Sequence, residues 1–322
     1  MIDTRATPEP LSREDQALLR LLDALRASGY RFTTVSPATH ARVNARSQNA
    51  TARTLADVFG WSRPYGADIL PEPILLLMHE AEIIEATSSG LSRSSVRVSS
   101  IGENLFLHSA FPTIDGHSVF FGPDTYRFAR AVRGGIPRLR APIQRAVDIG
   151  CGAGAGAIFM AQAAPSAEVL MVDINEAALR AARINATFAG ATRAHPCRSD
   201  LFADIDGRFD LIVSNPPYLN DPLQRAYRHG GGQLGEALSV RILDSSLPRL
   251  APGGTLILYT GMAIVDGVDP FRTAAAGMLA FHDVAWSYEE IDPDVFGEEL
   301  ETPAYSQVDR IAAVVLTVSR DT

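Results

Sequence analysis

The chain has 322 residues, of which 46% are hydrophobic and 20% charged, and its formal net charge is −8 at pH 7. This hydrophobic content excludes a disordered chain, and net acidity argues against coating nucleic acid through charge alone. The two cysteines, Cys151 and Cys197, are too few for a disulfide framework or a four-thiolate zinc site. Because a domain usually holds about 100–200 residues, the length predicts two domains.

The basic residues are all arginines, which we attribute to GC-rich codon usage. Residues 1–15 are polar and acidic, whereas a secretory signal needs an apolar core of about 7–15 residues behind a basic start. The longest apolar stretches, such as 74–78 and 255–259, are far shorter than the roughly 20 residues that span a bilayer. We therefore expect a soluble, cytoplasmic protein with no membrane segment.

The first third of the chain predicts helices followed by a hairpin, an order that resembles a winged-helix unit. Leucines recur with helical spacing in the first helix, for which Ser12 is the expected N-cap and Gly29 the stop. The hairpin strands alternate apolar and polar residues. The expected elements are helices over 11–28, 50–59 and 72–87 and strands over 94–100 and 103–109.

Positive charge is concentrated between Arg20 and Arg63. This window holds seven arginines but only Asp23 and Asp57, a local charge of +5. Two interpretations stay open: a solvated surface, or a docking face for RNA, the ribosome or an acidic protein.

Beyond this part, strands and helices alternate. Such βαβ alternation implies a parallel sheet with helices on both faces, so we predict a doubly wound, Rossmann-like α/β domain over 119–322 behind a smaller, helical domain over 1–118. An acidic segment over 288–301, either a solvated loop or a lid, precedes the last strand. The expected elements are strands over 146–149, 168–172, 209–214, 255–260, 282–288 and 310–319 and helices over 157–163, 176–188 and 236–247.

A glycine-rich turn follows the first of these strands, in the sequence VDIGCGAGAGA over 147–157. The strand ends at Asp148, and Gly150 and Gly152 begin the turn. Glycines are needed because a Cβ there would keep the backbone away from a ligand that lies across the strand ends. The turn also satisfies the loose dinucleotide pattern, so a nicotinamide oxidoreductase stays open.

Two further acids stand at the tips of the following strands. Asp173 comes 25 residues after Asp148, where a carboxylate can accept both ribose hydroxyls of a nucleoside. Asp200 can accept from an adenine amine while Leu201 or Phe202 packs on the ring. Three acidic strand tips with glycines after the first predict an adenosine site.

The motif Asn215-Pro216-Pro217-Tyr218 follows the strand FDLIVS directly. The prolines restrict the backbone and remove its donors, so the Asn215 side chain and the Pro216 carbonyl project as acceptors. Together they can hold both hydrogens of a planar –NH2 group. Tyr218 can stack on the planar group that carries the amine.

With this motif, the segment resembles the class I S-adenosylmethionine-dependent methyltransferases that act on planar nitrogen. The preceding Pro-Asp-Thr at 123–125 and the glycine-rich stretch after residue 229 are similar to the HemK-like release-factor glutamine N5-methyltransferases. The resemblance covers roughly 119–259. It implies a seven-stranded methyltransferase sheet, S-adenosyl-L-methionine as cofactor, and cofactor contacts by Asp124, Thr125, Asp148, Gly150, Gly152, Asp173, Ile174, Asp200, Leu201 and Asn215.

By the same resemblance, the four motif residues bind the acceptor, and Asn215, Pro216 and Tyr218 act in catalysis. We expect N-methylation of a protein glutamine, for which a translation factor is a candidate partner. An exocyclic base amine in RNA or DNA and a small-molecule amine stay open as acceptors. A regulator that only binds the cofactor is disfavoured because it would not need amine acceptors. We expect no metal site, since no histidine has ligand spacing, and a monomer.

Overall fold

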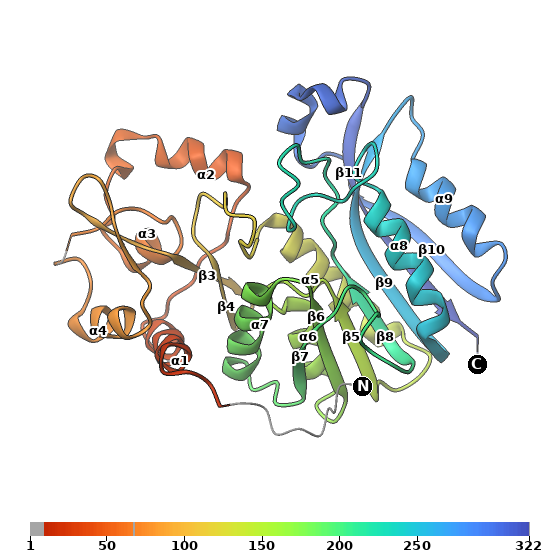
Figure 1. Cartoon of the computed structure of the whole chain (residues 1–322), viewed down its shortest axis with the longest axis horizontal. Helices are drawn as coiled ribbons and strands as arrows, with labels where there is room; N and C mark the ends of the chain where they lie inside the picture. Colours follow the sequence, from red (N-terminus) through yellow and green to blue (C-terminus); the bar gives the residue numbers. More distant parts are fainter. Residues whose placement is uncertain (1–9, 67, 322) are drawn as a thin grey trace.

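The computed structural model describes residues 10–66 and 68–321. The N-terminal elements lie on one side of the molecule, and the large sheet with its helices lies on the other (Figure 1). The predicted α/β architecture is confirmed by a seven-stranded sheet in the order β10-β11-β9-β8-β5-β6-β7.

The first helix is confirmed with its predicted cap. The Ser12 side chain accepts a hydrogen bond from the Asp15 amide, and Gly29 follows the helix with φ 74°. The predicted hairpin is also confirmed, as β3 pairs with β4. The N-terminal elements are α1 (Arg13–Ala27), α2 (Pro37–Asn44), α3 (Leu55–Phe59), α4 (Glu72–Glu80), β1 (Ile84–Ala86), β2 (Ser92–Ser94), β3 (Val96–Ile101) and β4 (Asn104–Ser109).

Two predictions in this region were wrong, and one helix was missed. The helix expected over 50–59 is only α3, because a capping box between Thr54 and Asp57 sets its start at Leu55. The helix expected over 72–87 ends at Glu80, since Glu82 has φ 55° and residues 84–86 pair with β2. Helix α2 was not predicted.

The large sheet is parallel in its centre and antiparallel at one edge. Strands β7, β6, β5, β8 and β9 run parallel, whereas β11 is antiparallel to both β9 and β10. Strand β9 is longer than the predicted 255–260. The strands are β5 (Arg145–Ile149), β6 (Glu168–Asp173), β7 (Ala194–Arg198), β8 (Phe209–Ser214), β9 (Leu250–Ile264), β10 (Val284–Asp292) and β11 (Arg310–Arg320).

Helices cover both faces of this sheet, as βαβ alternation predicted. One apolar core joins it to α5, α6 and α7, and a second joins it to α8 and α9. The order of the strands reverses between β5 and β8, which is where ligands bind in open α/β sheets. The helices are α5 (Pro123–Gly135), α6 (Ala155–Ala163), α7 (Glu176–Phe188), α8 (Ala237–Ser246) and α9 (Pro270–Leu279).

The acidic segment is not one loop. Residues 288–292 belong to β10 and pair with β11, and Gly297–Glu301 forms a 3-10 turn. Glu299 in this turn is buried and pairs with Arg228. The two interpretations of a single solvated loop or a single lid are therefore both replaced, because strand pairing and this ion pair fix most of the segment.

The arginine-rich window is partly neutralised. Four of its arginines form ion pairs, two of them with acids outside the window. The two outside acids offset two of the five net positive charges, so part of the local charge remains and both interpretations of this surface stay open. The pairs are Arg20–Glu80, Arg26–Asp23, Arg31–Glu103 and Arg63–Asp57.

The N-terminal part packs directly against α7 (Figure 1). Asp15 forms an ion pair of 2.7 Å with Arg180, and the Arg26 guanidinium lies 4.5 Å from the centre of the Phe188 ring. Phe106 of β4 belongs to the apolar core of the large sheet. The two predicted domains thus share a packed interface. Within residues 10–66 and 68–321, no helix is long and apolar enough to cross a membrane.

Candidate active site

A cavity of about 440 Å³ opens at the carboxyl ends of β5, β6 and β8, where the strand order reverses. Its volume is in the range of small-molecule and cofactor sites. It brings together all the predicted site residues except Asp148. Those that line it are Asp124, Thr125, Gly150, Gly152, Asp173, Ile174, Asp200, Leu201, Asn215, Pro216, Pro217 and Tyr218.

The glycine turn leaves room for a ligand. Gly150 has φ 68° and Gly152 has φ 52°, a left-handed conformation that side chains rarely adopt. A Cβ placed on either glycine would meet no atom within 4 Å and would project into open space. The Cys151 amide donates to the Val172 carbonyl (2.9 Å), which ties the turn to β6. Burial raises the pKa of the Cys151 thiol well above its usual value, so this cysteine is not an activated nucleophile.

Asp173 lies at the end of β6 and faces this turn. Its carboxylate accepts from the Gly152 amide (3.0 Å) and from the Asn175 amide (2.9 Å). Burial raises its pKa, although these amide hydrogen bonds oppose the shift. A carboxylate can accept about four hydrogen bonds, so acceptor sites remain for a vicinal diol.

Asp148 is placed differently from the prediction. Its side chain is buried behind the glycine turn and does not line the cavity. One carboxylate oxygen accepts from the Ala157 amide at the start of α6 (2.9 Å), whereas the other has no hydrogen-bond partner among the described residues. Burial raises the pKa of Asp148 to about 7. It therefore supports the turn from behind, and the predicted direct cofactor contact does not match this position.

The third strand tip resolves an alternative that the sequence left open. Leu201 lines the cavity, whereas Phe202 is buried in the sheet core. The Asp200 side chain is 64% exposed and lies 3.4 Å from Arg241. Ile174 lines the cavity with an unusually high exposure of 55%. Ile174 and Leu201 thus offer apolar contacts to a flat ring.

These features fit the nucleoside part of S-adenosylmethionine. The open space at Gly150 and Gly152 allows a ligand to approach the protein backbone closely. The remaining acceptor sites of Asp173 suit ribose hydroxyls, and Ile174 and Leu201 suit adenine. The residues that line this end of the cavity are therefore compatible with this cofactor.

Asn215 and Pro216 stand at the end of β8, beside the glycine turn. The Ser214 hydroxyl donates to the Ile149 carbonyl (2.7 Å), which fixes the ends of β8 and β5 to each other. Among the described residues, no hydrogen bond engages the Asn215 side chain or the Pro216 carbonyl. Both residues line the cavity. Two acceptors are therefore available for a ligand.

The Tyr218 ring is not free to stack on a planar amine in the way that the sequence predicted. It is buried, and its hydroxyl donates to Asp124 Oδ2 (2.6 Å). The ring rests on the backbone of Gly261, where a Cβ would come within 2.1 Å of it. The side chain thus forms part of the cavity wall, and its hydroxyl is already engaged.

Asp124 is the centre of a buried polar cluster. It accepts from Tyr218, from the Tyr259 hydroxyl (2.5 Å) and from Arg127 (3.1 Å), which also pairs with Asp292. Burial raises its pKa, and these donors oppose the shift. Tyr259 was missed by sequence reasoning because nothing local marks a strand residue whose partner is 135 positions earlier.

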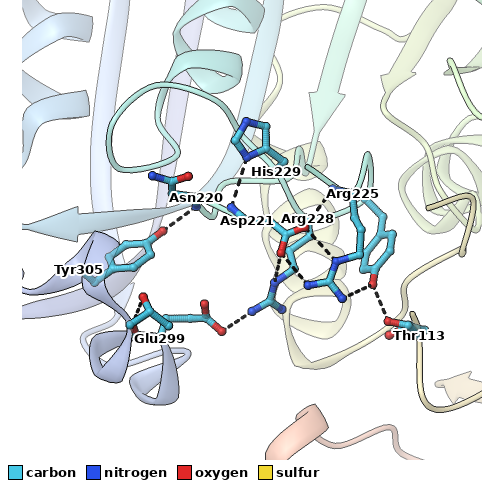
Figure 2. A network of polar contacts seen from close by, with 10 residues as sticks. Thr113, Asn220, Asp221, Arg225, Arg228, His229, Glu299 and Tyr305 are labelled. Carbon is cyan, nitrogen blue, oxygen red and sulfur yellow. Dashed lines mark hydrogen bonds and ion pairs between the residues drawn. The ribbon is translucent and has the colours of Figure 1, made fainter. Parts of the chain in front are cut away.

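A loop over 219–236 covers the end of the cavity at Asn215 and Pro216, which we call the acceptor end. Asp221 lies at the centre of the polar network of this loop, and its side chain, 1% exposed, accepts from Arg225 Nη2 (2.6 Å) (Figure 2). Arg225 lowers the pKa of Asp221 to about 2. Arg228 pairs with Glu299, and the Tyr227 hydroxyl donates to the Thr113 carbonyl (2.5 Å). The loop is therefore tied to both the C-terminal and the N-terminal part.

Five residues of this loop line the cavity, namely Leu219, Arg225, Ala226, Tyr227 and Arg228. Sequence reasoning missed them. The only available signal was the dense run of charged and aromatic residues between the proline motif and the following glycines.

Comparison with known proteins shows which family the central part of the chain matches. Residues 136–262 match the family described as methyltransferase small domain. The chain is 33% identical over 178 residues to a 4-amino-L-phenylalanine/4-methylamino-L-phenylalanine methyltransferase of Streptomyces pristinaespiralis, covering 46% of this chain and 60% of that protein. It is 30% identical over 200 residues to a release factor glutamine methyltransferase of Deinococcus radiodurans, covering 58% and 66%.

A shorter match, 40% identical over 84 residues, is to a ribosomal RNA small subunit methyltransferase C of Haemophilus influenzae and covers 26% of this chain and 25% of that protein. The chain thus spans from a quarter to about two thirds of the length of these relatives. The matched family region contains the glycine turn, the acidic strand tips and the Asn-Pro-Pro-Tyr motif. The chain therefore carries a class I S-adenosylmethionine-dependent methyltransferase domain of the HemK-like type, a class whose cofactor is S-adenosylmethionine.

Proposed function

We propose that this protein transfers a methyl group to a planar amide or amino nitrogen. The observation that carries the proposal is the pair of free acceptors, the Asn215 side chain and the Pro216 carbonyl, on the cavity wall beside the glycine turn. A planar –NH2 group has two hydrogens, and two fixed acceptors can hold both.

The chain's contribution is orientation and stabilisation of charge. When bound, S-adenosylmethionine supplies an electrophilic methyl group. A planar nitrogen is a weak nucleophile because its lone pair is delocalised. Acceptors on both of its hydrogens hold the nitrogen in line for displacement and stabilise the positive charge that develops on it. No strong general base is required if the proton leaves after transfer, and neither Asn215 nor Pro216 is one.

We propose a protein glutamine side chain as the leading acceptor. The Pro-Asp-Thr segment, whose resemblance suggests a glutamine acceptor, is joined to the proline motif by the hydrogen bond between Asp124 and Tyr218. The relative from Deinococcus radiodurans is named a release factor glutamine methyltransferase, which supports this choice.

Transfer of labelled methyl to a cell extract tests the proposal. We expect label to appear with the wild-type protein and to be lost with protease but not with nuclease. Label that only nuclease removes would point to a base amine. In that case substrate affinity should fall steeply with salt, because phosphate contacts release counterions. If no extract component is labelled while the cofactor binds, the proposed transfer is wrong.

An aromatic amine is a second candidate, favoured by the rings at the acceptor end. Phe111, Phe120 and Tyr227 line the cavity, and the last two rings lie nearly parallel with their centres 6.2 Å apart. Such walls suit a flat ring. The relative from Streptomyces pristinaespiralis is named for an amino-phenylalanine substrate, which supports this candidate. Label that stays in the small-molecule fraction of the extract would favour it.

A further inference from the structure

The charged groups that line the cavity are separated by sign. Carboxylates of Asp173 and Asp200 line the cofactor end, whereas Arg225 and Arg228 line the acceptor end. Asp124 also lines the cavity, but three donors already engage its carboxylate. The acceptor end therefore presents guanidinium groups, each paired with an acid outside the cavity lining, to whatever molecule occupies it.

Buried acids hold these arginines without lining the cavity themselves. Asp221 accepts from Arg225 Nε (2.8 Å) and Nη2 (2.6 Å), and Glu299 accepts from Arg228 Nη2 (Figure 2). Neither acid is among the cavity-lining residues. Because the acids lie behind the guanidinium groups, they preset the position of the arginines while leaving the cationic faces toward the cavity.

Arg228 keeps unused donors. The described hydrogen bonding of its side chain is limited to Nη2 with Glu299, since its Nε lies 3.7 Å from Asp221. The side chain is 18% exposed, and none of its nitrogen atoms is both buried and unpartnered. Arg225, in contrast, uses Nε, Nη1 and Nη2 for Asp221 and Tyr227. Arg228 is thus the residue with N–H groups available to a ligand, and Arg225 lies beside it with its guanidinium held by Asp221.

We propose that Arg228, flanked by Arg225, binds a carboxylate carried by a small, free methyl acceptor. This inference rests on the proposed transfer to planar nitrogen and, within it, selects a small acceptor over the protein glutamine. A guanidinium fork matches a carboxylate and binds it through charge-assisted hydrogen bonds. The acceptor is small because the Tyr227–Thr113 hydrogen bond joins the covering loop to the N-terminal part across the acceptor end. A polypeptide acceptor would have to separate that contact.

The test uses acceptors that differ only in the carboxylate. One pair is 4-amino-L-phenylalanine and its carboxamide, and the other is N-acetylglutamine and its carboxamide. Binding is measured by calorimetry on protein saturated with S-adenosylhomocysteine, and methyl transfer is measured separately. We expect the carboxylate form of at least one pair to bind at least about 10-fold more tightly than its carboxamide, the scale of one charge-assisted hydrogen bond.

Arg228→Gln should abolish this preference, and Arg228→Lys, which keeps the charge but loses the fork, should retain part of it. Arg46→Gln is the matched control, because Arg46 is exposed and forms no ion pair among the described residues. Its preference should equal that of the wild type. Thermal unfolding shows whether each variant folds. If Arg228→Gln does not fold, the reduced carboxylate preference expected of Arg228→Lys tests the inference.

Several results would overturn the inference while leaving the proposed function intact. They are equal binding of carboxylate and carboxamide, no binding of either carboxylate, or an unchanged preference in Arg228→Gln. Binding of glutamine peptides that carry a neighbouring glutamate can be measured in the same way. If Arg228 matters only for the binding of these peptides, the inference is also overturned, because the carboxylate would then belong to a protein. Failure of the extract assay described above concerns the proposed function instead.

Discussion

The Tyr218 hydroxyl donates a 2.6 Å hydrogen bond to Asp124 Oδ2 and so joins two segments that are 94 residues apart in sequence. Tyr218 closes the proline motif after β8, and Asp124 lies in the first turn of α5. Because both residues line the cavity, this bond fixes the acceptor motif relative to the rest of the site. It explains why the tyrosine is buried rather than free to stack.

Tyr218→Phe should lower kcat by about 10-fold and leave affinity for S-adenosylhomocysteine within about threefold. The loss is the scale of one hydrogen bond to a charged group, and the buried Asp124 keeps two other donors. Methyl transfer and calorimetry measure the two quantities. Tyr288→Phe is the matched control, since Tyr288 also donates to an aspartate, Asp269, outside the cavity. Equal losses of kcat in both variants would contradict a positioning role for Tyr218.

Asn215→Ala should lower kcat by about 100-fold or more, because it removes a preorganised acceptor for the reacting nitrogen. Binding of S-adenosylhomocysteine should change little, since Gly152, Asp173 and Ile174 remain. Single-turnover kinetics and calorimetry separate the two effects. An intact turnover rate would refute the assignment of this motif.

Asp148→Asn should flatten the dependence of stability on pH. The folded pKa of Asp148 is raised to about 7 from 3.8. The folded state therefore binds more protons than the unfolded state between these values, so ionisation of Asp148 lowers stability as pH rises from about 4 to about 7. Urea unfolding of both proteins across this range measures the effect. We expect the wild type to lose more stability than the variant, and parallel curves would contradict the prediction.

Asn185→Ala should weaken both folding and cofactor binding. Its fully buried amide accepts from the Leu107 amide (2.8 Å) and donates to the carbonyls of Leu107 (3.0 Å) and Ala153 (2.9 Å), and so links β4 to the glycine turn. Leaving these groups without partners should cost about 1–3 kcal/mol. Calorimetry with S-adenosylhomocysteine should show about a 10-fold weaker affinity, with faster hydrogen exchange over residues 150–156.

Gln162→Ala is the matched control for this change. Gln162 also bonds to the N-terminal part, through Asn104, but at an exposed position that does not touch the glycine turn. Its cofactor affinity should stay at the wild-type value. If both variants lose affinity for S-adenosylhomocysteine equally, the hydrogen bonds of the Asn185 side chain have no specific role in positioning the glycine turn.

The sequence by itself determined the α/β class and the meeting of Gly152, Asp173 and Asn215 at one edge of a sheet. Strand periodicity, glycines and strand-tip acids are local signals, and parallel strands bring their carboxyl ends together. It did not determine the ends of α3 and α4, which depend on a capping box and on strand pairing.

Only the tertiary structure decided that Asp148 lies behind the turn, that Tyr218 points to Asp124, and that Arg225 and Arg228 line the acceptor end. Each position depends on burial or on partners remote in sequence, as in the pairing of Arg228 with Glu299 across 71 residues. The direction of a side chain at such a site follows from which donors and acceptors the whole fold brings beside it, and no local pattern contains that information.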